Sequence, residues 1–259
     1  MRVVVTAYGA ISAAGAEVEA ALRAYRSGRT AAALISLGGE TCLAARLDKN
    51  ARATLDDFVG ALERRQKIFD PAAAMAAYAC ERAAASWFAG PDYAIVIGSA
   101  RGAAGRWEEY FSDFAPGRRF SPFASPATTA GGLASLAAAR LAERLGTPVT
   151  AFVVSQTCVS AAAAVATAVA LIRSGMVVRA LAGGAEAPLT PFTLAAMRST
   201  GAYAHIRRAE CPFPCMPLAP RDEDAMVMGE GAAVLALERE DKADVRPWAR
   251  IAGVGLACE

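Results

Sequence analysis

The chain has 259 residues, of which 55% are hydrophobic and 20% charged, so it can bury a large core and lacks the composition of a disordered protein. Its formal net charge is +2 and its few lysines are dispersed, which argues against nucleic acid as a partner. The six cysteines are scattered through a chain too large to need disulfides, and the first residues enter a strand without a signal-peptide pattern. We therefore expect a cytoplasmic protein with reduced thiols.

Short apolar runs alternate with longer helical patterns, which is typical of an α/β fold with largely parallel strands. In the first half of the chain the pattern predicts, in order, a strand at 3–6, a helix at 17–26, an irregular segment at 30–57, a helix at 66–87, a strand at 93–97 and a helix at 106–114. In the second half it predicts a helix ending at 145, a strand at 149–155, a helix at 158–174, a strand at 177–182, a helix at 191–197 and strands at 231–238 and 249–257. No linker is visible, so we expect a single domain over residues 1–259.

One stretch, residues 151–172, carries no charge and is long enough to span a bilayer. It contains several hydroxyl residues, its first part is β-branched, and its second part is rich in alanine. A buried strand that runs into a buried helix explains this composition better than a membrane span.

Two other patterns suggest ligands but lack the required spacing. The glycine-rich loop after the strand at 93–97 has neither the dinucleotide nor the P-loop arrangement, so a tight turn is the better interpretation. Cys211 and Cys215 lie four residues apart without a second pair of ligands. We therefore expect neither a cofactor site nor a metal site.

Cys158 is the candidate catalytic residue. It lies between an apolar strand and an alanine-rich helix, so its sulfur is predicted at a helix N-terminus. The partial positive charge there favours a thiolate, and free amides of the first turn can bind a developing oxyanion. The alternative is that Cys158 is an inert small apolar residue. Close packing of this helix is predicted by the alanines Ala161, Ala162, Ala163, Ala164 and Ala166.

Five segments, in the right order along the chain, resemble the β-ketoacyl-acyl-carrier-protein synthases of the thiolase-like superfamily. They are the opening strand and turn at 2–12, the segment from 121, the nucleophile turn at 157–160, the Gly-Gly-Ala-Glu run at 183–186 and the hairpin strand at 228–238. The resemblance implies the N-terminal half of a thiolase-like fold, a mixed five-stranded sheet flanked by helices. It also implies that Cys158 is the acyl-accepting nucleophile.

The chain departs from the family pattern at three places. Gln156 and Thr157 precede the cysteine where the family usually has Thr-Ala, and Glu-Asp-Ala stands at 223–225 in place of Arg-Asp-Gly. Ala161 occupies a family glycine position, which predicts altered backbone geometry there. These differences are compatible with the family fold, but they indicate that the substrate can differ from the usual one.

The family's second half is not found in this chain. In the family, that half supplies two catalytic histidines that stabilise the enolate formed by decarboxylation. This chain has one histidine, His205, in the polar segment 203–208, where a solvated surface side chain is expected. The resemblance therefore implies an acyltransferase of the β-ketoacyl synthase type that is not self-sufficient.

The partners implied by the resemblance are a full-length ketosynthase subunit and an acyl carrier protein, whose phosphopantetheine arm delivers the substrate. The resemblance also implies dimerisation through the strand at 149–155. A lone half would expose large apolar surfaces, so we expect an obligate partner. Arg64, Arg65 and Lys67 form a candidate patch for the acidic carrier protein, although such a run is also typical of a solvated helix face.

Two functions follow. In the first, the chain is a subunit of a β-ketoacyl synthase complex that elongates fatty-acid or polyketide chains, including aryl-polyene pigments, and Cys158 accepts the acyl group. In the second, it is a non-catalytic partner, similar to a chain length factor, that shapes the acyl tunnel of a full-length ketosynthase. The sequence leaves open whether the chain is a natural half-length subunit or part of a longer synthase.

Overall fold

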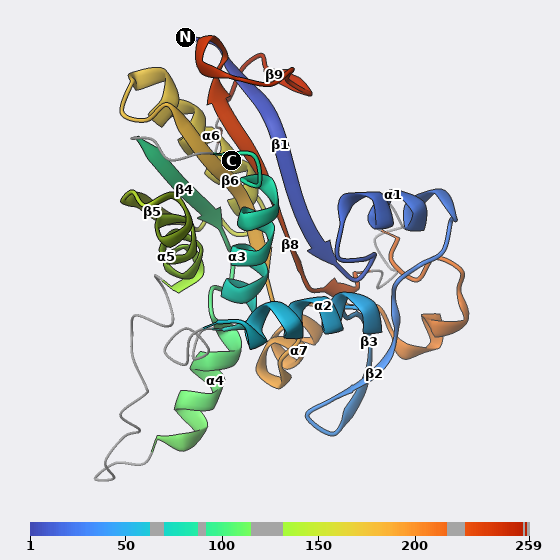
Figure 1. The fold of residues 1–259 in the computed structure, drawn as a ribbon. Coiled ribbons are helices and arrows are strands. Elements are labelled where there is room, and N and C mark those ends of the chain that lie inside the picture. Colours follow the sequence, from blue (N-terminus) through green and yellow to red (C-terminus); the bar gives the residue numbers. More distant parts are fainter. Residues whose placement is uncertain (63–69, 88–91, 115–131, 217–225, 256, 258–259) are drawn as a thin grey trace.

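The computed structural model describes residues 1–62, 70–87, 92–114, 132–216, 226–255 and 257. These residues form a six-stranded sheet in the order β5-β4-β6-β8-β1-β9 and a three-stranded sheet in the order β2-β3-β7. Helices α3 and α5 cover one face of the larger sheet and α6 covers the other (Figure 1). The result is an α/β architecture in three layers.

The elements have the following bounds. The strands are β1 (Val3–Ser12), β2 (Ala33–Leu37), β3 (Glu40–Ala45), β4 (Tyr93–Gly98), β5 (Val149–Val154), β6 (Arg179–Glu186), β7 (Met228–Gly229), β8 (Gly231–Arg239) and β9 (Ala249–Ile251). The helices are α1 (Val18–Arg26), α2 (Lys49–Gly60), α3 (Pro71–Ala83), α4 (Ala104–Asp113), α5 (Gly132–Leu145), α6 (Ser160–Ser174) and α7 (Pro191–Arg198). Two 3-10 turns are η3 (Ile206–Glu210) and η4 (Glu240–Lys242).

The predicted α/β class and mixed sheet are confirmed, with two corrections. The larger sheet has six strands rather than five, because β9 pairs with the outer edge of β1. The segment at 30–57, predicted to be irregular, contains β2, β3 and most of α2. Two features of the sequence indicate these elements. The β2–β3 turn is Gly38-Gly39, and both glycines have a positive φ. The Asp48 side chain caps α2 by accepting a 2.7 Å hydrogen bond from Ala51 N.

The directions of the strands determine at which edge of the larger sheet a ligand site can form. β1, β4, β5 and β6 run parallel to one another, while β8 is antiparallel to its neighbours β6 and β1. The carboxyl ends of the four parallel strands therefore lie along one edge of the sheet. Ligand sites in α/β sheets usually form outside this edge.

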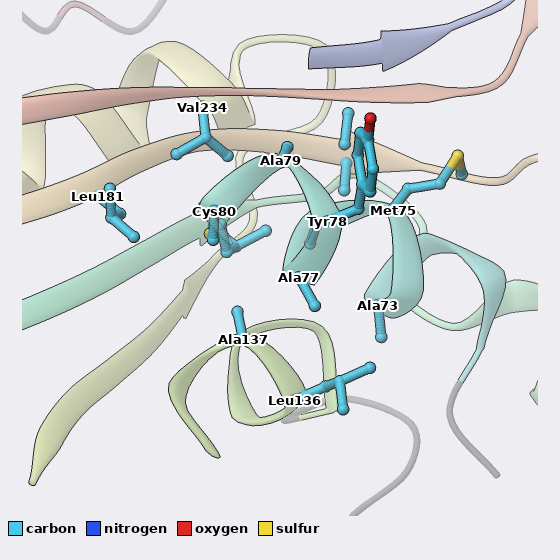
Figure 2. Close-up of a cluster of buried hydrophobic side chains, with 14 of the residues drawn as sticks. Ala73, Met75, Ala77, Tyr78, Ala79, Cys80, Leu136, Ala137, Leu181 and Val234 are labelled. Atoms are coloured by element: carbon cyan, nitrogen blue, oxygen red, sulfur yellow. The ribbon is translucent and has the colours of Figure 1, made fainter. Parts of the chain in front are cut away.

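The two faces of the sheet have separate apolar cores. On β4, Tyr93, Ile95 and Ile97 pack with α3 and α5, while Ala94 and Val96 pack with α6. This alternation follows from the two-residue period of a strand. Figure 2 shows the first core, in which α3 lies between the strands that carry Leu181 and Val234 and helix α5, which carries Leu136 and Ala137. Strand β4 is thus buried on both faces, as is usual for a parallel strand flanked by helices on both sides.

Asp70 joins the start of α3 to the start of α4. Its fully buried carboxylate accepts hydrogen bonds from Ala72 N at 2.8 Å and from Arg106 N at 3.2 Å. Burial raises the pKa of this carboxyl, while the two amide donors act in the opposite direction. One side chain therefore satisfies amides at two helix N-termini.

The strand at 149–155 and the helix after it are less buried than their composition predicts. Among the residues that the structure describes, β5 is an edge strand paired with β4 alone, and Phe152 and Val153 are more than one third exposed. The segment Thr157–Ser174 is long and apolar enough to cross a membrane by length and composition, and 39% of it is buried in the structure. Along α6, Ala163, Ala164 and Ala166 are buried as predicted, whereas Ala161 and Ala162 are exposed.

The first turn of α6 lies against two glycines at the ends of strands. A Cβ added at Gly98 of β4 would lie 2.2 Å from Ser160 O, and one added at Gly184 of β6 would lie 2.7 Å from the Cβ of Ala161. Such distances are far inside van der Waals contact. Glycine at both positions is therefore what allows α6 to begin at the carboxyl edge of the sheet.

Replacing Gly98 with alanine should displace the start of α6 and destabilise the protein by roughly 1–3 kcal/mol, as overpacking of a tight contact does. Gly60→Ala is the matched control, since Gly60 ends α2 and a Cβ there meets no atom within 4 Å. Urea unfolding of both variants measures the difference. Equal stability of the two variants would contradict the contact.

Ala164 tests the packing of α6 on the sheet. It is fully buried in the second core, so Ala164→Leu should lower the free energy of unfolding by roughly 1–3 kcal/mol. Ala170 lies on the exposed side of the same helix, and Ala170→Leu should change the free energy of unfolding by less than about 0.5 kcal/mol. Thermal and urea unfolding compare the two variants, and a neutral Ala164→Leu would show that this face is not packed.

Candidate functional site

Cys158 lies in the turn between β5 and α6, two residues before the first helical residue, Ser160. Its side chain is exposed. Val159 N donates to Gln156 O at 3.1 Å and Ser160 N donates to Thr157 O at 3.2 Å, so two successive turns enclose the cysteine. The predicted position at a helix start is confirmed, with the helix beginning slightly later than expected.

The backbone of this turn is unusual at Thr157, whose φ is +47°. Among the described residues only Asp92 shares a positive φ without being glycine. Ala161, where the departure from the family pattern predicted altered geometry, is an ordinary helical residue. The altered geometry predicted at Ala161 is therefore not observed, and the Ala161 methyl is accommodated by the missing Cβ of Gly184.

Cys158 borders a cavity of about 550 Å³ at the carboxyl edge of the sheet. The ends of β1, β4 and β6 and the start of β8 form its floor, with Gly98, Gly184 and Ala232 among the residues. Helix α1 forms the opposite wall through Val18, Leu22 and Tyr25. The lining is mostly apolar, which suits an acyl chain better than a charged ligand.

Glu186 is the acidic residue in the cavity wall. It ends β6 and accepts hydrogen bonds from Ser99 Oγ at 2.7 Å, from Ala100 N and from Arg101 N at 3.4 Å. Ser99 Oγ in turn accepts a bond from Gly102 N at 2.9 Å. The glycine-rich loop predicted to be a tight turn is thus held beside Cys158 by one carboxylate.

The other cysteines have different environments. Cys42 and Cys80 are buried, and burial raises the pKa of both thiols, so neither is a candidate nucleophile. Cys211 and Cys215 are exposed but lie away from the cavity lining. In the described part of the chain no group of three or more His, Cys, Asp or Glu side chains could hold a metal ion.

His205 is not brought to Cys158. It is exposed, precedes η3, and its Nδ1 accepts a 3.3 Å bond from Arg207 N. It is absent from the cavity lining, as its polar segment predicted. Arg64, Arg65 and Lys67, the segment from 121 and residues 223–225 lie outside the described residues.

Sequence reasoning missed three features of the site: the wall formed by α1, the role of Glu186 and the left-handed backbone of Thr157. The Gly-Gly-Ala-Glu run at 183–186 forms the last four residues of β6, whereas the pattern predicts a strand only to residue 182. Paired small residues after a strand were the available signal for a close approach. The segments that approach the glycines of β6 are set by the order of the strands in the sheet, which the sequence pattern does not give.

Comparison with curated proteins finds relatives among nodulation and fatty-acid synthesis proteins. Nodulation protein E of Rhizobium meliloti is 35% identical over 128 residues, which cover 48% of this chain and 30% of that protein. The 3-oxoacyl-[acyl-carrier-protein] synthase 2 of Synechocystis sp. is 28% identical over 144 residues, which cover 54% of this chain and 33% of that protein. The matched part is thus about one third of the length of these relatives.

Solved structures share the fold over nearly the whole chain. A chain of the ishigamide ketosynthase/chain length factor matches with a TM-score of 0.75 and 25% identity, covering 97% of this chain and 62% of that chain. A chain from the Xenorhabdus doucetiae complex of a ketosynthase with its chain length factor matches with a TM-score of 0.68 and 20% identity, covering 92% of this chain and 58% of that chain. The second likeness concerns the fold alone.

The family-level comparison covers most of the chain. The model of the β-ketoacyl synthase N-terminal domain matches residues 1–243, which include every strand of the larger sheet except β9 and the whole turn that carries Cys158. The chain therefore belongs to the β-ketoacyl synthase family and carries that family's N-terminal domain.

Proposed function

We propose that this chain is the acyl-accepting part of a β-ketoacyl synthase that elongates fatty-acid or polyketide chains, with Cys158 as the nucleophile. The observation that carries the proposal is the position of Cys158, exposed before the first turn of α6 and bordering an apolar cavity. Family membership over residues 1–243 supports it. The acyl group arrives as a thioester on the phosphopantetheine arm of a carrier protein.

The first chemical step is a thioester exchange. The Cys158 sulfur attacks the acyl carbonyl carbon, a new carbon–sulfur bond forms, and the bond to the phosphopantetheine sulfur breaks. The proton lost by the Cys158 thiol is gained by the departing carrier thiol, so the exchange needs no oxidant or reductant. The exposed position of Cys158 before the first turn of α6 leaves its sulfur accessible to the incoming thioester.

The second step, decarboxylative condensation, needs donors where the enolate oxygen develops charge. Removing one such donor from an enzyme typically lowers the rate about 10²–10³-fold. His205 does not border the Cys158 cavity, so we propose that a partner or a further segment supplies these donors. The chain would then not condense acyl and malonyl groups alone.

Two apolar surfaces support a partner. The exposed side of α6 and the segment after β9 enclose a groove of about 770 Å³, lined by Val159, Ala162 and Val254 among others. The β5 edge, with Phe152 and Val153 exposed, is unpaired along its outer side in the described residues. Unpaired apolar edges favour association. We propose that a full-length ketosynthase covers these surfaces, with β5 as the dimer strand, in the cytoplasm.

The second candidate is a partner that shapes the acyl tunnel, similar to a chain length factor. The distance of His205 from the cavity favours it, and two of the matching structures contain a chain length factor. The exposed cysteine at the cavity favours the catalytic role instead. In either role, we propose aryl-polyene pigments among the elongated products.

Iodoacetamide at neutral pH should modify Cys158 faster than any other cysteine, because the proposed role as acyl acceptor requires a reactive and accessible thiol. Cys211 and Cys215 are matched controls, since they are also exposed, and peptide mass spectrometry separates the sites. Buried Cys42 and Cys80 should react only on unfolding. Equal rates at Cys158 and Cys211 would remove the case for an activated nucleophile.

Reconstitution distinguishes the two functions. The chain is mixed with its cognate full-length ketosynthase, carrier protein and malonyl donor, and product lengths are measured. Loss of elongation in Cys158→Ala supports the catalytic role, whereas retained elongation with altered lengths supports tunnel shaping. A monomer of the isolated chain that elongates acyl groups unaided would contradict both.

A further inference from the structure

The residue before the nucleophile holds a conformation that its side chain disfavours. Thr157 is β-branched, and its φ of +47° lies in the left-handed region. Such residues are strained unless the surrounding structure holds them in place. The turn spanning residues 156–159, closed by the Val159 N to Gln156 O bond, places this positive φ at its first central position, where glycine, asparagine or aspartate is usual.

Ser160 provides the restraint. Its side chain is 3% exposed and lies on the protein side of the turn. Ser160 Oγ accepts a 2.8 Å hydrogen bond from Gln156 N and donates a 2.6 Å hydrogen bond to Thr157 O. One hydroxyl thus bonds to the amide of the residue before Thr157 and to the carbonyl of Thr157 itself.

These bonds distinguish Ser160 from an ordinary helix cap. A capping hydroxyl precedes the helix and accepts from amides further along the chain. Ser160 is itself the first residue of α6, and its hydroxyl bonds back toward β5. Its effect is therefore on the turn that carries Cys158 rather than on the amides of the helix.

The position of Ser160 is itself fixed from outside the turn. Gly98 lacks a side chain where Ser160 O and Ala161 N approach the end of β4. The backbone of Ser160 is therefore held in place by β4, and the conformation of residues 156–159 depends on the hydrogen bonds of the Ser160 hydroxyl. Without the hydroxyl, water can satisfy Gln156 N, because this residue is exposed, and Thr157 O keeps only the 3.2 Å bond from Ser160 N. Thr157 is then less restrained and can leave the left-handed region more easily.

We propose that Ser160 is a positioning residue, whose hydroxyl holds Thr157 in the left-handed region and thereby presents the Cys158 sulfur to the cavity. The inference rests on the proposed role of Cys158 as nucleophile. It assigns to Ser160 no contact with the substrate.

The test is a double-mutant cycle on the full chain. The rate of iodoacetamide modification of Cys158 is divided by that of Cys211 in the same molecule, which removes differences in reagent and in global unfolding. The variants are Ser160→Ala, Thr157→Gly and their combination, because glycine adopts positive φ without strain. Ser174→Ala is the matched control, since Ser174 Oγ makes a comparable 3.0 Å bond to Leu171 O at the other end of α6.

Ser160→Ala should lower the ratio about tenfold, which corresponds to about 1.4 kcal/mol. In the Thr157→Gly background the same substitution should change it less than twofold, and Ser174→Ala should leave it unchanged. An unchanged ratio in Ser160→Ala, or an equal loss in both backgrounds, would overturn the inference. A wild-type ratio of one would instead contradict the proposed nucleophile, so the two failures are distinguishable.

Discussion

The close approach of α6 to the ends of β4 and β6 is the constraint on which the site depends. Gly98 and Gly184 leave no room for a side chain, so the first turn of α6 cannot shift without moving Cys158. The strained turn, the cavity and the exposed thiol all follow from this packing. A helix that begins at the carboxyl edge of a parallel sheet directs its N-terminal amides toward the space where ligands bind.

Buried or half-buried carboxylates hold the surrounding segments in register. Glu238 is 3% exposed and accepts from Thr6 Oγ1 at 2.6 Å and Trp87 Nε1 at 3.2 Å, and it pairs with Arg179 at 2.6 Å. Glu230 similarly accepts from Leu47 N at 3.0 Å and pairs with Arg52 at 2.8 Å. Such groups join distant parts of the chain, and losing one partner leaves a buried charge uncompensated. Together with Glu186 they fix the sheet, the small β2-β3-β7 sheet and the loop beside Cys158.

Under the proposed function, the chemistry of this chain would be incomplete by itself. Its carboxyl edge presents an exposed cysteine and an apolar cavity, but its single histidine caps a turn elsewhere. The outer side of α6 and the edge of β5 expose alanine, valine and phenylalanine side chains. A partner that covers these surfaces and brings donors to the cavity would complete the active site, which is the common element of both functions considered.

The sequence by itself determined the α/β class, the main helices and strands after residue 70 and the place of Cys158 between a strand and a helix, because these depend on local periodicity. It did not determine the edge position of β5, the wall formed by α1 or the left-handed Thr157. Those follow from strand order and from backbone contacts such as Gly98 with Ser160, which join residues 62 positions apart. Apolar periodicity predicts which residues of a helix or strand are buried, because it is a local property. Which segment buries them depends on the strand order and is decided only by the tertiary structure.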